Sequence, residues 1–249
     1  MLCAVLIWVS PAWAQVNTES LRSTDTGLSG ALELSLSNRT GNTDLLTGGA
    51  ALQLAHNTNT RTLLFAADVT RSERRAEEIA NRGFGHARWT HFLSRRVGWE
   101  LFVQHEYDSF ALLDARTLLG TGPRFTLFDR GGEGHSQKAF LGMASMWEGE
   151  RLDVPPAGPD DPTPEAVRLS SYLSLALAWD KTRLSGTVYA QPRFGEPKDL
   201  RLLAETALRV VVAGPVGLKF SLTMRHDSDP PGGVRSTDTT LTNQLSVEF

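Results

Sequence analysis

Residues 216–225 read VGLKFSLTMR, a strict alternation of side-chain types. The even-numbered positions are apolar, whereas the odd-numbered positions hold Gly, Lys, Ser, Thr and Arg. The same period of two runs through residues 28–37 and, with one interruption, through residues 240–249. Successive side chains of a β-strand point to opposite faces, so this period indicates strands with one apolar and one polar face.

Reading the whole chain in this way predicts about twelve strands. They are expected near residues 28–39, 44–56, 61–72, 82–93, 97–108, 115–128, 136–150, 165–179, 182–193, 200–213, 216–227 and 236–249. Most are well above the length of about 5–6 residues that is common in globular sheets. A tilted strand needs about 9–11 residues to cross a bilayer. The sequence therefore predicts an all-β fold, a transmembrane antiparallel up-and-down β-barrel of about 12 strands over residues 28–249.

The connections between the expected strands give a second test. If both chain ends lie in the periplasm, the even-numbered connections should be short turns and the odd-numbered ones longer loops. The even-numbered connections are residues 57–60, 94–96, 129–136, 180–181 and 214–215, and the odd-numbered ones include 72–81, 151–164 and 228–235. The short connection 40–43 departs from the rule, and 129–136 is long for a turn.

The polar faces of the expected strands carry many charges, which would line the lumen if the apolar faces meet lipid. The candidate lumen charge lattice consists of Glu33, Asp68, Arg82, Arg88, Glu100, Glu106, Arg116, Arg124, Arg168, Arg201, Glu205, Arg209, Lys219 and Arg225. Opposite charges recur on neighbouring strands, as in Arg88 beside Glu100 and Glu205 beside Lys219. We expect such charges to pair and to rigidify the barrel, because an unpaired buried charge costs several kcal/mol. The alternative is a small pore in which the excess of arginine favours anions.

Aromatic residues fall near the expected strand ends. The predicted aromatic girdle consists of Trp89, Trp99, Tyr107, Trp147, Trp179 and Phe249. Aromatic belts at both interfaces are typical of membrane barrels. The alternative is that these are ordinary core aromatics of a soluble sheet.

The first 14 residues predict a secretory signal peptide. An apolar run is followed by Pro11 and by Ala12 and Ala14, so we expect cleavage after Ala14. The single cysteine, Cys3, would leave with this peptide, so the exported chain would carry no disulfide. Residues 15–27 are then expected to form a short periplasmic segment before the barrel.

Composition excludes several classes of function. The net charge of −3 and the pI near 6.1 argue against a nucleic-acid partner. The histidines show no metal-ligand spacing, and we expect no cofactor, no metal site and no catalytic residues. A barrel lipid hydrolase would need an activated serine, for which His226 and Ser228 are the nearest candidates.

Three stretches resemble a known family. Residues 227–242 resemble the last hairpin of the salt-induced outer-membrane protein family, sometimes called YdiY-like, a domain of unknown function. Residues 41–44 resemble its first hairpin, and residues 84–125 its central part. His226, in place of an expected tyrosine, and the proline-rich stretch 154–164 depart from the family pattern.

The resemblance implies an exported barrel of the Gram-negative outer membrane, and the name suggests envelope or osmotic homeostasis. We expect a structural barrel or a narrow small-solute channel, with an outer-membrane lipid hydrolase and a soluble periplasmic β-barrel binding protein as alternatives. The expected partners are outer-membrane lipids and lipopolysaccharide, together with the barrel assembly machinery, which would recognise the C-terminal strand ending in Phe249. A monomer is favoured.

Overall fold

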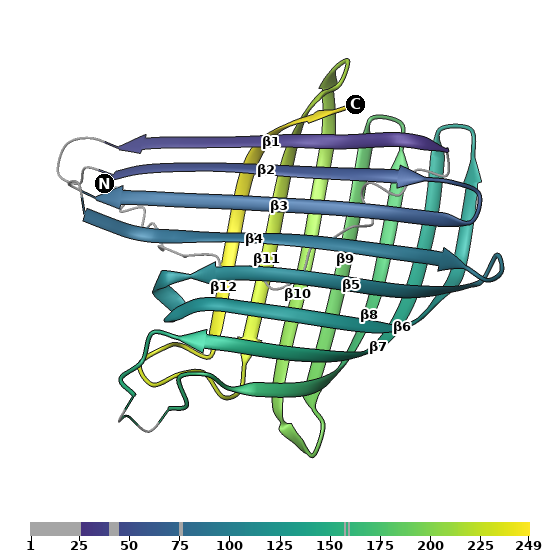
Figure 1. The fold of residues 1–249 in the computed structure, drawn as a ribbon. Coiled ribbons are helices and arrows are strands. Elements are labelled where there is room, and N and C mark those ends of the chain that lie inside the picture. The colour runs from purple at the N-terminus through teal and green to yellow at the C-terminus, as the bar shows by residue number, and fades with distance from the viewer. Residues whose placement is uncertain (1–25, 40–44, 75–76, 157, 159) are drawn as a thin grey trace.

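The computed structural model describes residues 26–39, 45–74, 77–156, 158 and 160–249. Within this part, twelve antiparallel strands pair with their sequence neighbours and β1 pairs with β12, which closes the barrel (Figure 1). The strands are β1 (Gly27–Arg39), β2 (Leu45–Asn57), β3 (Arg61–Arg74), β4 (Glu77–Phe92), β5 (Val97–Asp108), β6 (Leu113–Gly132), β7 (His135–Leu152), β8 (Glu165–Trp179), β9 (Thr182–Arg193), β10 (Glu196–Ala213), β11 (Val216–Asp227) and β12 (Thr237–Glu248). A 3-10 turn, η2 (Ser109–Ala111), follows β5. Among the described residues, no helix has the length and apolar character of a membrane span.

The expected signal peptide and nearly all of the expected segment 15–27 lie outside the described residues. The all-β fold and the antiparallel barrel with about 12 strands are confirmed. Each of the twelve expected segments corresponds to one strand.

Several strands are longer than the alternation predicted, among them β4, β6 and β10. β4 begins at Glu77 instead of residue 82, and β10 begins at Glu196 instead of residue 200. Register shifts in both extensions break the period of two, between Ser72 and Glu73 on the partner of β4 and between Glu196 and Leu200 on β10. A bulge inserts a residue without ending the pairing, so a strict alternation search stops there too early.

The barrel has two different ends. We call the end with the β2–β3, β4–β5, β6–β7, β8–β9 and β10–β11 connections the turn end, and the opposite end the loop end. At the turn end, the connection expected at 129–136 is shorter than predicted, because β6 and β7 pair as far as Gly132 and His135. At the loop end, the expected loop 72–81 is also largely a hairpin, paired as far as Arg74 and Glu77. The long connections of the described chain are therefore residues 153–164 and 228–236, both at the loop end.

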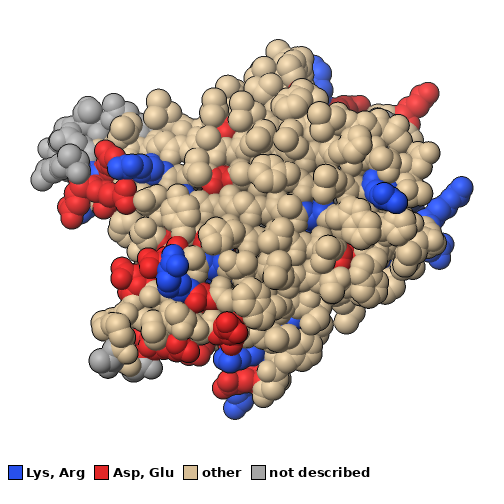
Figure 2. All heavy atoms as spheres, in the orientation of Figure 1, with Lys and Arg blue, Asp and Glu red and all other residues tan. Residues whose placement is uncertain are grey.

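The two faces of the barrel wall differ in polarity. On β11, Leu218 and Phe220 face outward and are 45% and 42% exposed, whereas Ser221 and Thr223 face the lumen and are 8% and 7% exposed. In the view of Figure 2, charged residues gather at the two ends and the wall between them is nearly free of charge. The apolar face therefore points outward, the reverse of a soluble sheet.

Aromatic rings pack over glycines inside the lumen. A side chain at Gly120 would collide with the ring of Phe102 on the adjacent strand, and one at Gly142 would collide with the ring of Tyr172. Glycine in a strand often marks such close approach of a neighbouring group. These rings fill the middle of the barrel, together with buried Leu118.

The seam between β1 and β12 is the shortest pairing in the barrel. Residues 31–34 pair with residues 245–248, and Gly30 and Phe249 exchange two backbone hydrogen bonds of 2.8 and 3.0 Å. Phe249 also covers Gly30 with its ring. In Figure 1 the two strands diverge beyond this short contact, toward the loop end. The end of the chain is therefore what closes the ring.

Candidate functional site: the charged lumen

The turn-end half of the lumen contains a buried charge centre on β5. Both Glu100 carboxylate oxygens accept hydrogen bonds, from Arg88 (3.3 Å), Arg124 (3.4 Å), Thr90 (3.3 Å) and Tyr172 (2.8 Å). We call these five residues the hub. None of their side chains is appreciably exposed.

Aromatic rings enclose the hub. The guanidinium carbon of Arg124 lies 3.8 Å from the ring centre of Phe140, and that of Arg88 lies 5.3 Å from Phe102 and 5.6 Å from Tyr172. Such stacking is favourable, particularly where the cation is desolvated. Tyr172 reaches Glu100 from β8, on the far side of β6 and β7, so its hydroxyl links two non-adjacent strands across the luminal face of β6 and β7.

Closer to the turn end, two further contacts cross between strands. Lys219 on β11 donates to Glu33 on β1 at 2.7 Å. Arg209 on β10 contacts Glu248 at 3.0 Å and Ser246 at 3.3 Å. The space left among these side chains is a cavity of only about 20 Å³. The side chains that line this cavity therefore leave little space between them.

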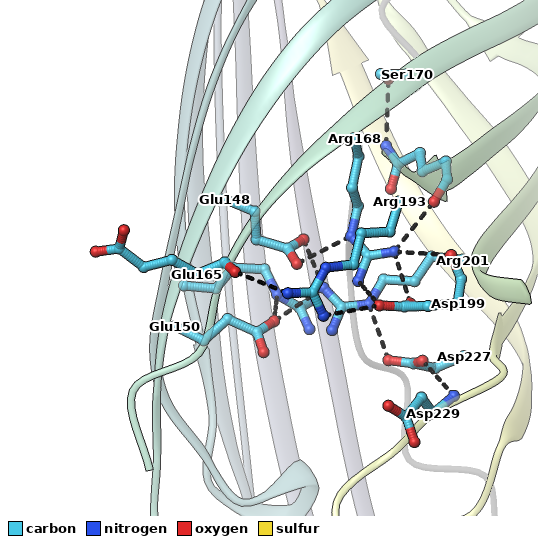
Figure 3. Close-up of polar contacts among 12 residues, drawn as sticks. Glu148, Glu150, Glu165, Arg168, Ser170, Arg193, Asp199, Arg201, Asp227 and Asp229 are labelled. Atoms are coloured by element: carbon cyan, nitrogen blue, oxygen red, sulfur yellow. Dashed lines mark hydrogen bonds and ion pairs between the residues drawn. The ribbon is translucent and has the colours of Figure 1, made fainter. Parts of the chain in front are cut away.

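The loop-end half of the lumen is hollow. A cavity of about 490 Å³, which we call the vestibule, lies between the strand ends and the two long loops. Its wall contains an ion network, shown in Figure 3. Arg201 contacts Glu148 and Glu150 on β7 and donates to Asp227 on β11 at 2.9 Å.

Two more arginines extend this network along the wall. Arg168 donates to both oxygens of Asp199 at 2.8 and 3.1 Å and to Glu148 at 3.0 Å. Arg116 donates to Glu106 at 2.9 Å and also contacts Glu150. Bidentate and shared carboxylates of this kind suit the planar guanidinium, and they fix the shape of the cavity wall.

The two long loops are joined above the vestibule. The carboxylate of Asp160 accepts a hydrogen bond of 3.1 Å from the backbone amide of Gly232. Both loops contain prolines, and the loop 153–164 also carries several acids. Asp161, Asp229 and Asp238 line the cavity near its mouth. The mouth of the vestibule is thus acidic and partly bridged.

Two arginines of the vestibule differ from the others. Arg82 on β4 is 4% exposed and lines the cavity, and its Nε atom is buried without a hydrogen-bond partner. Arg225 on β11 also lines the cavity, and its Nε and Nη2 atoms are buried without a partner. An unsatisfied buried donor costs about 1–3 kcal/mol. Two arginines with unsatisfied donors at the same cavity suggest that an acceptor on a bound molecule would complete their hydrogen bonds.

The structure places the fourteen residues of the predicted lattice on the luminal face, but in separate groups. Arg88, Glu100 and Arg124 meet in the hub, while Glu33, Lys219 and Arg209 lie near the turn end. The members that line the vestibule are Arg82, Glu106, Arg116, Arg168, Arg201 and Arg225. Asp68 on β3 and Glu205 on β10 are buried elsewhere in the lumen.

Of the two pairs expected from the sequence, Arg88 does contact Glu100, and Lys219 contacts Glu33 on β1, a partner that was not expected. The register sets Lys219 opposite Arg209 and Glu205 opposite Thr223. The alternation shows which face a residue occupies, whereas its partner depends on the stagger between strands.

Several luminal residues were missed from the sequence. Glu148 and Glu150 share one face of β7 and follow the alternation, so their parity could have identified them. Asp199 lies just before the expected start of its strand, in the bulged extension of β10. Tyr172 was overlooked because a tyrosine hydroxyl gives no charge signal.

The predicted aromatic girdle lies at the strand ends. Trp89, Trp99 and Trp179 are on the outer face near the turn end, where Phe249 is also exposed. Near the loop end, Trp147 lies over Gly149, and Tyr107 is half-buried over Gly83.

The residues considered for hydrolysis make other contacts. His226 shares a hydrogen bond of 2.9 Å with Thr237. The Ser228 hydroxyl donates to the Lys198 carbonyl and accepts from the Leu200 amide, both at 2.8 Å. Within the described ranges, no group of three histidine, cysteine or acidic side chains is arranged to hold a metal ion.

An apolar wall, a closed antiparallel ring and a charged interior define the class of transmembrane up-and-down β-barrels. The sequence profile of a family described as "Protein of unknown function, DUF481" matches residues 32–249, and the chain belongs to this family. No curated protein matches its sequence.

Three of the solved structures that match this chain are the following. The translocator domain of the autotransporter NalP from Neisseria meningitidis is 12% identical, with a TM-score of 0.45 over 93% of this chain and 91% of that chain. The KdgM porin is 8% identical, with a TM-score of 0.39 over 89% and 98%. The TodX monoaromatic hydrocarbon channel, in a deletion mutant, is 7% identical, with a TM-score of 0.34 over 91% and 84%. At these identities the function has to be argued from the residues themselves.

Proposed function

We propose that this protein is an outer-membrane barrel whose lumen is closed to solutes in its resting state. The observation that carries this proposal is the hub, because Glu100 on β5 gathers luminal side chains from β4, β6 and β8 into one buried cluster. Nearer the turn end, the cavity lined by Glu33, Arg209 and Lys219 holds only about 20 Å³, scarcely enough for a single water. The protein would then act as a structural element of the envelope that presents a charged vestibule to the outside.

The proposed location in the outer membrane is supported by the apolar outer face of the barrel wall. Exposed leucine, phenylalanine and valine side chains cover the strands, which suits lipid and would aggregate in water. Because the ring is closed, each strand has a hydrogen-bonded neighbour on both sides, as the hydrocarbon region of a membrane requires. Export with cleavage after Ala14, contact with lipopolysaccharide at the loop end and recognition of the C-terminal strand during assembly belong to the same proposal. No enzymatic activity is proposed.

Planar-bilayer recording tests the closed state. Residues 15–249 would be refolded, and a shift in gel mobility on heating would verify that the barrel has formed. We expect no steady conductance from the folded protein at low voltage. Steady, salt-dependent steps from the unaltered protein would contradict the proposal.

A second candidate function is a narrow gated channel. It is favoured by the way the lumen is filled, because the hub consists of strand side chains that can change rotamer without unfolding a segment. In that case Tyr172→Ala, which removes the link between β8 and β5, should produce brief openings. Phe220→Ala removes a ring from the outer wall and serves as the matched control. Silence from both folded variants would exclude the gated channel and leave the structural barrel.

A further inference from the structure

The charges of the vestibule are separated by depth. Its lining includes seven arginines and eleven carboxylates, an excess of four acids. Acids from the long loops and the start of β12 stand near the mouth, among them Asp160, Asp229 and Asp238. Arg82 and Arg225 project from β4 and β11, deeper in the strands. A solute entering from the loop end would therefore meet a mouth where acids outnumber the single loop arginine, Arg235, before it reaches Arg82 and Arg225.

The free donors of Arg225 have a specific geometry. Nε and Nη2 form one edge of the guanidinium, and two parallel N–H groups on such an edge match the two oxygens of a carboxylate. On Arg116, Arg168 and Arg201, the Nε atom donates to a carboxylate of the chain itself. On Arg225 both atoms of this edge lack a partner, although Glu106 and Glu205 lie near enough to act on it electrostatically.

Arg82 supplies a second incomplete donor beside the first. Its Nε atom also lacks a partner, and Arg82 is close enough to Arg225 for the two cations to repel each other. An anionic group placed between them would relieve this repulsion and satisfy the free donors. The ion network of the wall is otherwise fixed by its own contacts, so the site would be largely preformed.

From these contacts we propose that the vestibule binds a small zwitterionic solute. Its carboxylate would occupy the edge of Arg225 near Arg82, and its ammonium group would face the acids of the mouth. A simple anion would be repelled by the excess of acids, and a simple cation would leave the deep donors unsatisfied. The volume of about 490 Å³ falls within the usual range for small-ligand pockets.

Calorimetric titration of the refolded barrel tests this proposal. The probes are three ω-amino acids of increasing length, glycine, 4-aminobutanoate and 6-aminohexanoate. Hexanoate and hexylammonium carry one of the two charges each and match the longest probe in length. We expect at least one ω-amino acid to bind at least tenfold more tightly than either single-charge probe.

Variants identify the site of binding. Arg225→Gln should abolish saturable binding, and Arg225→Lys, which keeps the charge but loses the two-donor edge, should weaken it about tenfold. Arg183→Gln changes an arginine near the turn end, bound to Glu248, and should leave binding unchanged. Arg225→Lys keeps the test interpretable if the glutamine variant does not fold.

The other outcomes overturn the proposal. Equal binding of hexanoate would indicate a simple anion site, and equal binding of hexylammonium would indicate a simple cation trap. Saturable binding that survives Arg225→Gln in a folded barrel would place the solute elsewhere. Absence of binding by all three ω-amino acids would mean that the vestibule is not a site for such solutes.

Discussion

The hub and the vestibule are built from the same residue types but have opposite effects on the lumen. In the hub, one carboxylate is shared by Arg88, Arg124 and Tyr172, and aromatic rings pack against the two guanidinium groups. In the vestibule, the arginines of the ion network each contact more than one carboxylate, and the network surrounds a cavity. A charge lattice can therefore either close a barrel or hold it open, depending on whether rings fill the space between the charges.

The largest expected effect comes from removing the centre of the hub. Glu100→Ala leaves two buried arginines without their carboxylate, which should destabilise the barrel by about 3–5 kcal/mol. Denaturant unfolding of the refolded barrel measures this change. Glu150→Ala in the vestibule is the matched comparison and should cost clearly less, because Arg116 and Arg201 retain other acids. Equal losses in the two variants would remove the distinction between hub and vestibule.

A double-mutant cycle sharpens the description of the hub. Arg88→Ala should lower the melting temperature, since Glu100 loses one of its two cationic partners. Adding Glu100→Ala should cost less than it does alone, with a coupling of about 0.5–3 kcal/mol. The cycle requires four melting curves under the same detergent conditions. Strictly additive losses would mean that this buried pair contributes no interaction of its own.

Loss of the link between β8 and β5 should have an intermediate effect. Tyr172→Phe keeps the ring over Gly142 and removes only the hydroxyl that donates to Glu100. Hydrogen bonds to charged groups contribute about 1.5–3 kcal/mol, so the free energy of unfolding should fall by about that amount. An unchanged unfolding curve would show that the hydroxyl does not tie β8 to β5.

The smallest effect is expected from an ion pair near the surface of the turn end. The Arg183 side chain is 51% exposed and contacts Glu248 at 2.7 Å. Exposed pairs contribute about 0–1 kcal/mol because solvent and salt screen them. Arg183→Ala should therefore shift the unfolding midpoint only slightly. A loss as large as that of Tyr172→Phe would mean that exposure is a poor guide to these contacts.

The alternation predicted which face a residue occupies more reliably than it predicted contacts. Leu218 and Phe220 point outward and Lys219 inward, because the strand period is intrinsic to the backbone. The partner of Lys219 was missed, because the stagger across the β1–β12 seam depends on how the whole ring closes. Asp199 was missed because a bulge interrupts the pattern around it.

The vestibule could not be predicted from the sequence, for a further reason. Its walls come from β4 to β12 and the two long loops. Neither the joining of the loops by Asp160 and Gly232 nor the free edge of Arg225 has a local signature in the sequence. The hub was half visible, since the pairing of Arg88 with Glu100 was expected. The rings that turn this pair into a closure were not, because apolar residues on a luminal face look like interruptions of the pattern.

Thiol labelling tests most directly whether the lumen is closed at the hub and open at the vestibule. Cys3 is the single cysteine of the sequence, so residues 15–249 provide a background without thiols. Ser236→Cys would place a thiol in the vestibule wall, and Thr90→Cys would place one in the hub, where Thr90 is 1% exposed. We predict that a charged, water-soluble thiol reagent modifies the first variant rapidly and the second only after unfolding. Equal labelling of both thiols in the folded barrel would contradict the closed hub.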